Sequence, residues 1–300
     1  MDSATPASGK NYADFVLIAI TAVWGSTFLL IKDALGDVDP MSFLALRFGL
    51  GACVLTLLAR RKLLDRKLAV VGASLGALLF LGFALQTWGL SSTTPSRSAF
   101  ITGLSVVLVP LASILVFRRR PSPPTMVAVL LAAVGLRIFT QSSAPGASAY
   151  LKGDVLTVGC AVAYAFHITL TERYAARFPA IPLVAVQLWV VAGVSAASLP
   201  FVDRHLHLSG ALVGAVVYCG VVATAGAIGL QTWAQARTRA VRAAVIYSLE
   251  PVFTALYGAL SGRERLTRTT LLGGGLILLA VLVSELGGMQ WRRWGASRLP

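Results

Sequence analysis

Charged side chains are scarce in this chain of 300 residues. They make up 13% of the sequence, whereas hydrophobic residues make up 56%, and the mean hydropathy is +0.77. A soluble domain carries roughly 25% charged residues, and a soluble fold of this length has too little interior to bury so much apolar surface. The composition therefore argues against an aqueous globular enzyme. The same apolar content excludes an intrinsically disordered chain.

Cysteine and the familiar cofactor motifs are also scarce. The three cysteines, Cys53, Cys160 and Cys219, are odd in number and lie inside apolar runs, which excludes a disulfide scaffold and indicates small buried hydrophobic residues. There is no P-loop, no His-Glu-x-x-His motif and no dinucleotide fingerprint, so a nucleotide-driven pump is not expected. His205 and His207 form a weak metal motif at best. We expect no catalytic residues, no metal and no cofactor.

Acidic residues number only 12 against 26 Lys and Arg, which gives a net charge of +14. The basic residues lie in short clusters between apolar runs, with few aromatic residues among them. This is the pattern of cytoplasmic loops in a membrane protein. It is not the pattern of a nucleic-acid surface, so we expect a lipid bilayer and no nucleic acid as the surroundings of this chain.

Long apolar runs dominate what is present. A bilayer core about 30 Å thick needs about 20 apolar helical residues, and a helix satisfies its own backbone hydrogen bonds in lipid. These runs predict an all-α integral membrane protein with ten transmembrane helices. The expected spans are Asp14–Ile31, Met41–Ala59, Ala69–Leu90, Ser96–Phe117, Pro123–Phe139, Lys152–Thr171, Pro182–Pro200, Leu208–Gln231, Val241–Leu260 and Arg268–Glu285.

The two halves of the chain are similar to each other. A shift of 145 positions aligns Leu85–Leu104 with Leu230–Leu249, and nine of the twenty positions are identical, including a Leu-Gln-Thr-Trp block. Earlier in the chain a shift of 140 positions aligns Asp14 with Asp154, Trp24 with Tyr164, and Arg47 with Gln187. Five spans per copy is an odd number, so the second copy must enter the membrane from the opposite side. The sequence therefore predicts two inverted five-helix repeats, the arrangement of many secondary transporters.

The distribution of basic residues predicts the orientation. With the amino terminus inside the cell, 17 Lys and Arg lie on the cytoplasmic side, eight lie on the other side, and Arg47 lies within a span. This bias places both termini in the cytoplasm of a multi-pass protein in the cell membrane. The expected segments are a tail 1–13, a first repeat 14–140, a linker 141–151, a second repeat 152–286 and a tail 287–300.

Several short motifs resemble the drug/metabolite transporter superfamily, EamA type. They are Trp24-Gly25-Ser26-Thr27-Phe28 in the first span, Ala45-Leu46-Arg47-Phe48 in the second, Leu249-Glu250-Pro251-Val252-Phe253 in the ninth, and Gly262-Arg263-Glu264-Arg265-Leu266-Thr267 before the tenth. One departure is Arg118-Arg119-Arg120-Pro121, which has no Glu where the second copy has Glu264. The resemblance implies a plasma-membrane carrier, often an exporter of amino acids or other small metabolites.

Polar and aromatic residues at depth in the spans are the candidate solute-binding groups, since ionisable groups inside a membrane are costly. The predicted set is Trp24, Ser26, Arg47, Gln86, Tyr164, His167, Gln231, Tyr247 and Glu250. Arg47 could bind a carboxylate or phosphate, or it could be structural or extend toward the membrane surface. Glu250 could take up a proton or bind an ammonium group, or it could stabilise a proline-broken turn. An ion pair between Arg47 and Glu250 is left open.

The remaining candidates have similar alternatives. His167 could relay protons or simply pack. Gln86 and Gln231 could form hydrogen-bonding layers on either side of the solute, while Trp88 and Trp233 are better explained as interfacial anchors. Pro110 and Pro251 are expected to break the fourth and ninth spans, because proline removes a backbone donor and frees a carbonyl.

The function expected from these features is secondary transport. A small organic solute would move by alternating access around a central cavity, in the export direction, driven by a gradient of protons or of the solute itself. The alternatives are an integral-membrane enzyme acting on lipid and a channel or sensor. The sequence does not specify the solute or the oligomeric state.

Overall fold

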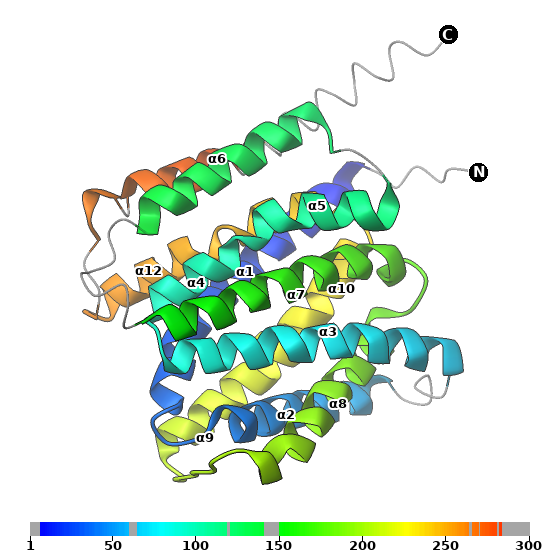
Figure 1. The fold of residues 1–300 in the computed structure, drawn as a ribbon. Coiled ribbons are helices and arrows are strands. Elements are labelled where there is room, and N and C mark those ends of the chain that lie inside the picture. The colour runs from blue at the N-terminus through cyan, green and yellow to red at the C-terminus, as the bar shows by residue number, and fades with distance from the viewer. Residues whose placement is uncertain are drawn as a thin grey trace.

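The computed structural model describes residues 7–59, 65–118, 121–140, 150–263, 266–269, 271–280 and 282–283. Its long helices run side by side along one direction (Figure 1). The helical elements of the first half are α1 (Ala7–Ala34), α2 (Pro40–Ala59), α3 (Arg66–Ser91), α4 (Pro95–Gly103), α5 (Ser105–Phe117) and α6 (Pro123–Thr140). In the second half they are α7 (Leu151–Ala175), α8 (Ala180–Ser198), the 3₁₀ turn η3 (Leu199–Phe201), α9 (Gly210–Val217), the π-helix η4 (Tyr218–Gly226), α10 (Ala227–Gln235), α11 (Ala240–Tyr247) and α12 (Glu250–Leu260).

Eight helical segments among the described residues are long and apolar enough to cross a membrane. They are Tyr12–Ala34, Pro40–Ala59, Arg66–Ser91, Pro95–Phe117, Leu151–Ala175, Ala180–Phe201, Gly210–Gln235 and Ala240–Leu260. Two shorter apolar helices, Pro123–Gly135 and Leu271–Ala280, coincide with the predicted fifth and tenth spans. The structure thus confirms an all-helical, multi-pass membrane protein.

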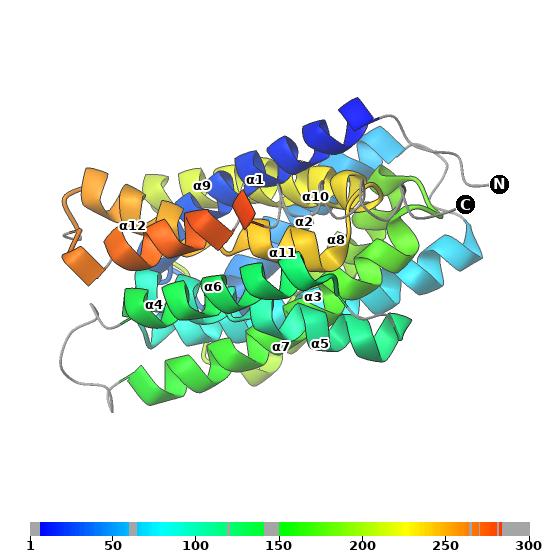
Figure 2. The ribbon, with the colours of Figure 1, turned by 90° about the horizontal axis from the view of Figure 1, so that it is seen from above.

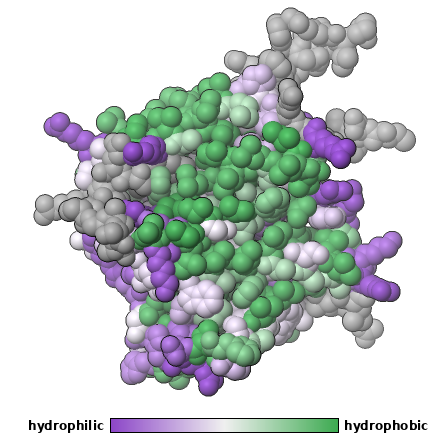
Figure 3. Space-filling model, viewed as in Figure 1, coloured by the Kyte–Doolittle hydropathy of each residue, from purple (hydrophilic) through white to green (hydrophobic). Residues whose placement is uncertain are grey.

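The surface of the bundle suits a bilayer. On the face shown in Figure 3 a broad apolar band covers the middle of the helices, and hydrophilic side chains gather toward the two ends of the helix direction. Leucines such as Leu57, Leu115 and Leu130 are exposed on the surface of the bundle. In water these side chains would be an aggregation hazard, but in lipid they are at no disadvantage.

One segment boundary falls within the described residues. The first helix, Ala7–Ala34, extends seven residues before the predicted span start at Asp14, and Ala13 and Asp14 are buried. The predicted linker 141–151 and tail 287–300 fall mostly or wholly outside the described residues. Glu264 and Arg265 of the predicted motif also lie outside them.

Two spans are interrupted within the bundle. The fourth is divided at Leu104 into α4 and α5, and the span Ala240–Leu260 is divided at Ser248–Leu249 into α11 and α12. Pro251 lies at the start of α12, as expected for a proline that cannot continue the preceding helix. Pro110 differs from the expectation: it lies inside α5, and the interruption comes six residues earlier. The helix continues through Pro110 because only one donor is lost there and the neighbouring turns remain hydrogen-bonded.

The core contains two large apolar clusters. One is built from α1, α4, α5, α6, α7, α10, α11 and α12 together with Ile277 and Ala280, and the other mainly from α2, α3 and α8 with Ala225 and Ile228. Trp24 and Tyr164 pack against both clusters, and both side chains are only partly buried. The polar groups of the bundle interior gather where these two aromatic residues lie.

Candidate solute-binding cavity

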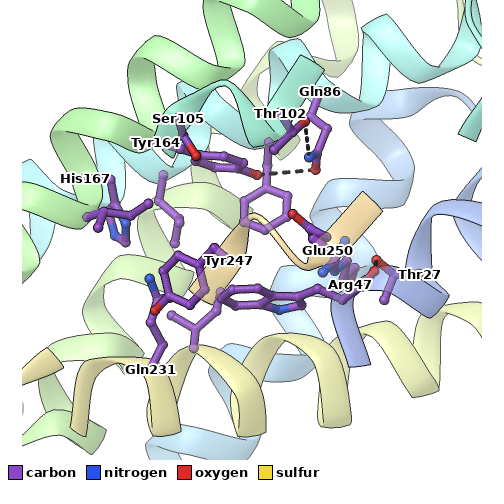
Figure 4. Close-up of a pocket in the computed structure, with 15 residues that line it drawn as sticks. Thr27, Arg47, Gln86, Thr102, Ser105, Tyr164, His167, Gln231, Tyr247 and Glu250 are labelled. Carbon is purple, nitrogen blue, oxygen red and sulfur yellow. Dashed lines mark hydrogen bonds between the residues drawn. The ribbon is translucent and has the colours of Figure 1, made fainter. Parts of the chain in front are cut away.

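A cavity lies inside the bundle at the junction of the two apolar clusters. The space inside it that water can occupy is about 60 Å³, enough for a few water molecules. Figure 4 shows the labelled side chains directed toward one another from several helices. The lining residues are Trp24, Thr27, Arg47, Leu79, Phe83, Gln86, Thr102, Ser105, Tyr164, His167, Ile168, Ile228, Gln231, Tyr247 and Glu250.

The structure brings eight of the nine predicted binding residues to this cavity. The exception is Ser26, whose hydroxyl bonds the carbonyl of Val23 at 2.7 Å and lies 2.9 Å from the hydroxyl of Tyr218. Trp88 and Trp233, expected as interfacial anchors, do not line the cavity. The anchor role of these two tryptophans and a role for the eight lining residues in binding both remain predictions.

Arg47 is the most deeply buried charge among these residues. Its side chain comes from α2 and is 1% exposed, so it does not extend to the membrane surface. The Nε atom donates to Thr224 Oγ1 at 2.7 Å, and the guanidinium carbon lies 5.3 and 4.9 Å from the ring centroids of Phe48 and Phe83. Nη1 has no hydrogen-bond partner. A buried donor of this kind is costly unless a ligand satisfies it.

Glu250 supplies a carboxyl group to the same cavity. It is the first residue of α12, directly after the break in the span, and it precedes Pro251. Within the described part of the chain it forms no ion pair with Arg47 or with any other residue. The cavity wall therefore includes a guanidinium and a carboxyl group that are not paired with each other, and a solute with a carboxylate and an ammonium group could contact both.

Amide and hydroxyl groups form a hydrogen-bonded layer on one side of the cavity. Gln86 on α3 donates from Nε2 to Thr102 Oγ1 at 3.1 Å, and Tyr164 donates from its hydroxyl to Gln86 Oε1 at 3.3 Å (Figure 4). On the other side Gln231 donates to Gln235 Oε1 at 3.0 Å. The two glutamines are therefore both anchored, and each still borders the cavity.

Aromatic side chains form the apolar part of the wall. The rings of Trp24 and Tyr247 meet edge-on with centroids 5.5 Å apart, and Trp24 Nε1 donates to the carbonyl of Ala223 at 2.9 Å. Tyr247 is 5% exposed and its hydroxyl has no partner. Phe83 contacts Tyr164 at 5.4 Å between centroids. Such a wall suits an amphipathic solute with a few oriented polar groups.

The imidazole of His167 lines the cavity and is already hydrogen-bonded to another side chain of the protein. Its Nε2 lies 2.9 Å from Gln187 Oε1, and both side chains are buried. Gln187 in turn donates to the carbonyl of Leu183 at 3.3 Å. Gln187 is the residue that the repeat register aligns with Arg47, so one copy places a charge at this position and the other places an amide bonded to His167.

Three polar lining residues were not among the predicted set: Thr27, Thr102 and Ser105. The internal repeat could have identified them, because each is aligned with a predicted binding residue of the other half. A shift of 140 aligns Thr27 with His167, and a shift of 145 aligns Thr102 with Tyr247 and Ser105 with Glu250. Thr224, which anchors Arg47, carries no such sequence signal. It lies in the π-helix η4, which the sequence pattern did not predict.

Comparison with known proteins identifies relatives along the whole chain. The model of the EamA-like transporter family matches residues 11–141 and again residues 151–286. An uncharacterized transporter of Archaeoglobus fulgidus is 34% identical over 277 residues, covering 92% of this chain and 87% of the relative. A probable amino-acid metabolite efflux pump of Salmonella typhimurium is 25% identical, covering 91% of this chain and 94% of that protein.

A solved crystal structure has the same fold. It superposes with a TM-score of 0.78 at 20% sequence identity, and the match covers 92% of this chain and 98% of the other. At this identity the likeness concerns the arrangement of helices alone.

Proposed function

Since the chain belongs to the EamA-like transporter family, we propose that it is a secondary transporter that exports a small organic metabolite by alternating access. The proposed binding site is the cavity that contains Arg47 and Glu250. No nucleotide-binding loop is present in the sequence, so the energy source in this proposal is an ion or solute gradient.

The observation that carries the proposal is that a guanidinium and a carboxyl group line one cavity and neither forms an ion pair with a described residue. Arg47 has a buried Nη1 without a partner, and Glu250 has no ion-pair partner among the described residues. A carboxylate on the solute would accept hydrogen bonds from Arg47, and an ammonium group would approach Glu250. The solute class is therefore a zwitterion, with the aromatic wall of Trp24 and Tyr247 against its apolar part. The name of the Salmonella relative, an amino-acid metabolite efflux pump, is consistent with this class.

The proposal includes ten membrane crossings arranged as two inverted repeats. Its support is the double match to the family model, the interruptions at Leu104 and Leu249, which a shift of 145 aligns, and the equivalent lining residues from both halves. In such a transporter the binding site lies between the repeats and is opened to each side in turn. Both termini are then cytoplasmic.

Proton coupling is the energy source we propose for export. Glu250 is the carboxyl group that lines the cavity, and a carboxyl in an apolar site can hold a proton in one state of the cycle and release it in another. Solute and proton would compete for this group, so that inward movement of a proton is exchanged for outward movement of the solute.

Ligand-induced thermal stabilisation of the purified protein tests the binding site. We expect at least one zwitterionic compound in a panel of amino-acid metabolites to raise the melting temperature, since a ligand that binds only the native state stabilises it by mass action. The Arg47→Gln variant should lose this response. The matched control Arg263→Gln removes an Arg that is half exposed and remote from the cavity lining, and it should keep the response. A panel that stabilises neither the parent nor the control would contradict the proposed site.

A further inference from the structure

Two Arg–Asp ion pairs join the halves of the chain. Arg97 near the start of α4 pairs with Asp154 near the start of α7, and its Nε lies 2.8 Å from Asp154 Oδ1. Arg242 near the start of α11 pairs with Asp14 of α1 at 2.6 Å. The side chains are 7–20% exposed, so both pairs are largely shielded from solvent. Charges this far buried are costly to separate.

The two pairs are equivalent in the repeat register. A shift of 145 aligns Arg97 with Arg242, and a shift of 140 aligns Asp14 with Asp154. Each Arg therefore pairs with the Asp of the other half. The supporting contacts are also equivalent, because Thr93 donates to Asp154 Oδ1 and Thr238 donates to Asp14 Oδ1, each at 3.4 Å.

The pairs lie at opposite ends of the bundle. Figures 1 and 2 show α4 and α7 beginning at the left-hand end, whereas α1 and α11 begin at the right-hand end. The cavity lies between these ends, since its wall includes residues farther along each of the same helices. One ion pair therefore lies on each side of the proposed binding site.

Each pair is attached to the cavity through a short half-helix. Arg97 and the lining residue Thr102 are both on α4, which has nine residues and ends at the Leu104 break. Arg242 and the lining residue Tyr247 are both on α11, which has eight residues and ends at Tyr247, just before the break at Ser248–Leu249. A half-helix bounded by a break can move as a unit without deforming the helix that follows it.

Besides the ion pair and the threonine contact, a third interaction anchors the start of α4 and the start of α11. Lys32, near the end of α1, donates from Nζ to the carbonyls of Leu90, Ser91 and Thr93 at 2.8–3.1 Å, just before α4. Glu172, near the end of α7, accepts the backbone N–H of Ala240 at 2.7 Å, at the start of α11. A shift of 140 aligns Lys32 with Glu172. The first contact fixes the entry to α4 and the second fixes the entry to α11.

We propose that the Arg97–Asp154 and Arg242–Asp14 ion pairs are the two gates of the transporter, and that each opens while the other stays closed. The proposal rests on the proposed function and specifies how access to its cavity is controlled. In the conformation described here both pairs are formed, and the space that water can occupy in the cavity is only about 60 Å³. Separation of one pair would free α4 or α11 to swing away and open the cavity on that side.

Labelling of a cavity cysteine tests the gates without any solute. The full-length protein carries Ser105→Cys as the reporter, with Cys53, Cys160 and Cys219 replaced by Ala, and is treated with a membrane-impermeant maleimide in right-side-out and inside-out vesicles. Ser105 lines the cavity and is 5% exposed. Asp154→Asn should raise labelling from the outer face on the order of tenfold, and Asp14→Asn should do so from the inner face, because each removes one charge of a buried pair.

The exposed ion pair between Arg263 and Asp33 supplies the matched control. Its side chains are both 51% exposed, and exposed pairs contribute little, so Asp33→Asn should leave labelling unchanged. Increased labelling from the same face in both gate variants, or an equal increase in the Asp33 variant, would overturn the proposal.

The charge-exchanged variants separate gating from folding. Should the single variants fail to elute as folded monodisperse protein, R97D/D154R and R242D/D14R take their place, compared with R97Q and R242Q. Recovery of low labelling on exchange supports the gates. If the charge-exchanged variants fold but every folded variant is labelled like the parent protein, the pairs only stabilise the fold. The labelling experiment uses no solute. A negative labelling result therefore does not affect the thermal-stabilisation test of the binding site, and a negative stabilisation result does not affect the interpretation of the labelling.

Discussion

Thr224 holds Arg47 through a 2.7 Å hydrogen bond from the guanidinium Nε to its hydroxyl oxygen. Thr224 belongs to the π-helix η4, and it is fully buried. π-Helical turns are rare and concentrate at functional sites. Nη1 of the same guanidinium is buried and has no hydrogen-bond partner among the described residues. The hydrogen bond from η4 therefore orients Arg47, the cation of the proposed binding site.

Replacing Thr224 by Val should weaken solute binding while leaving the fold intact. The change removes the hydroxyl and keeps the shape, so Arg47 loses the bond that orients it. A hydrogen bond to a charged group contributes about 1.5–3 kcal/mol, which corresponds to a loss of affinity of roughly tenfold or more. Titration of the best-stabilising metabolite against purified protein measures the effect.

The matched control for this change is Thr224→Ser, which retains the hydroxyl and should bind the metabolite close to normally. Equal affinities of the Val and Ser variants would show that Thr224 does not position Arg47 for binding.

Glu250→Gln tests coupling. If Glu250 carries the proton, the neutral amide cannot exchange one, so solute movement driven by an imposed pH gradient should be lost. Exchange of labelled for unlabelled solute needs no net proton transfer and should continue at saturating solute, with a lower affinity because the amide offers no charge to the ammonium group. Both rates are measurable in proteoliposomes that contain the variant. A pH-driven rate equal to that of the parent would remove Glu250 from the coupling mechanism.

His167→Gln should behave differently, although His167 lines the same cavity. Its imidazole is occupied by Gln187 at 2.9 Å and is buried, which is the environment of a packing residue. We therefore expect the variant to retain pH-driven movement and to change only the affinity for the solute. Loss of the pH response in this variant, with exchange intact, would transfer the proton role from Glu250 to His167.

Two glycines of α2 give a matched pair for helix packing. A Cβ on Gly51 would lie 2.9 Å from the backbone oxygen of Gly220, whereas a Cβ on Gly49 would meet nothing within 4 Å. Gly51→Ala should therefore lower the stability by about 1–3 kcal/mol, and Gly49→Ala should cause no loss. Thermal unfolding in detergent compares the two. Similar melting temperatures would contradict the close contact between α2 and η4.

Much of the fold could be predicted from the apolar runs alone. Their length and spacing gave the positions of the long helices, because backbone in lipid has few alternatives to a helix. The candidate site also followed, since eight of nine chosen residues line one cavity. Arg47, His167 and Glu250 were identifiable because polar groups inside apolar spans are rare and costly.

The remaining features depend on tertiary packing. The fourth span breaks at Leu104 and not at Pro110. Gly103 weakens the helix at this point, but Pro110 is the stronger helix breaker by sequence, so the position of the break is decided by packing. Thr224 is one small polar residue among many, and its role arises only from contact with α2, 177 residues earlier in the chain. The Arg–Asp pairs between halves were likewise invisible until the helices were placed together.

Counter-transport in proteoliposomes tests the central claim most directly. Vesicles preloaded with the stabilising metabolite should take up the labelled compound saturably and faster than empty vesicles, and Arg47→Gln should abolish this acceleration. No accelerated uptake of any zwitterionic metabolite in the panel, from protein shown to be folded, would contradict alternating access around this cavity.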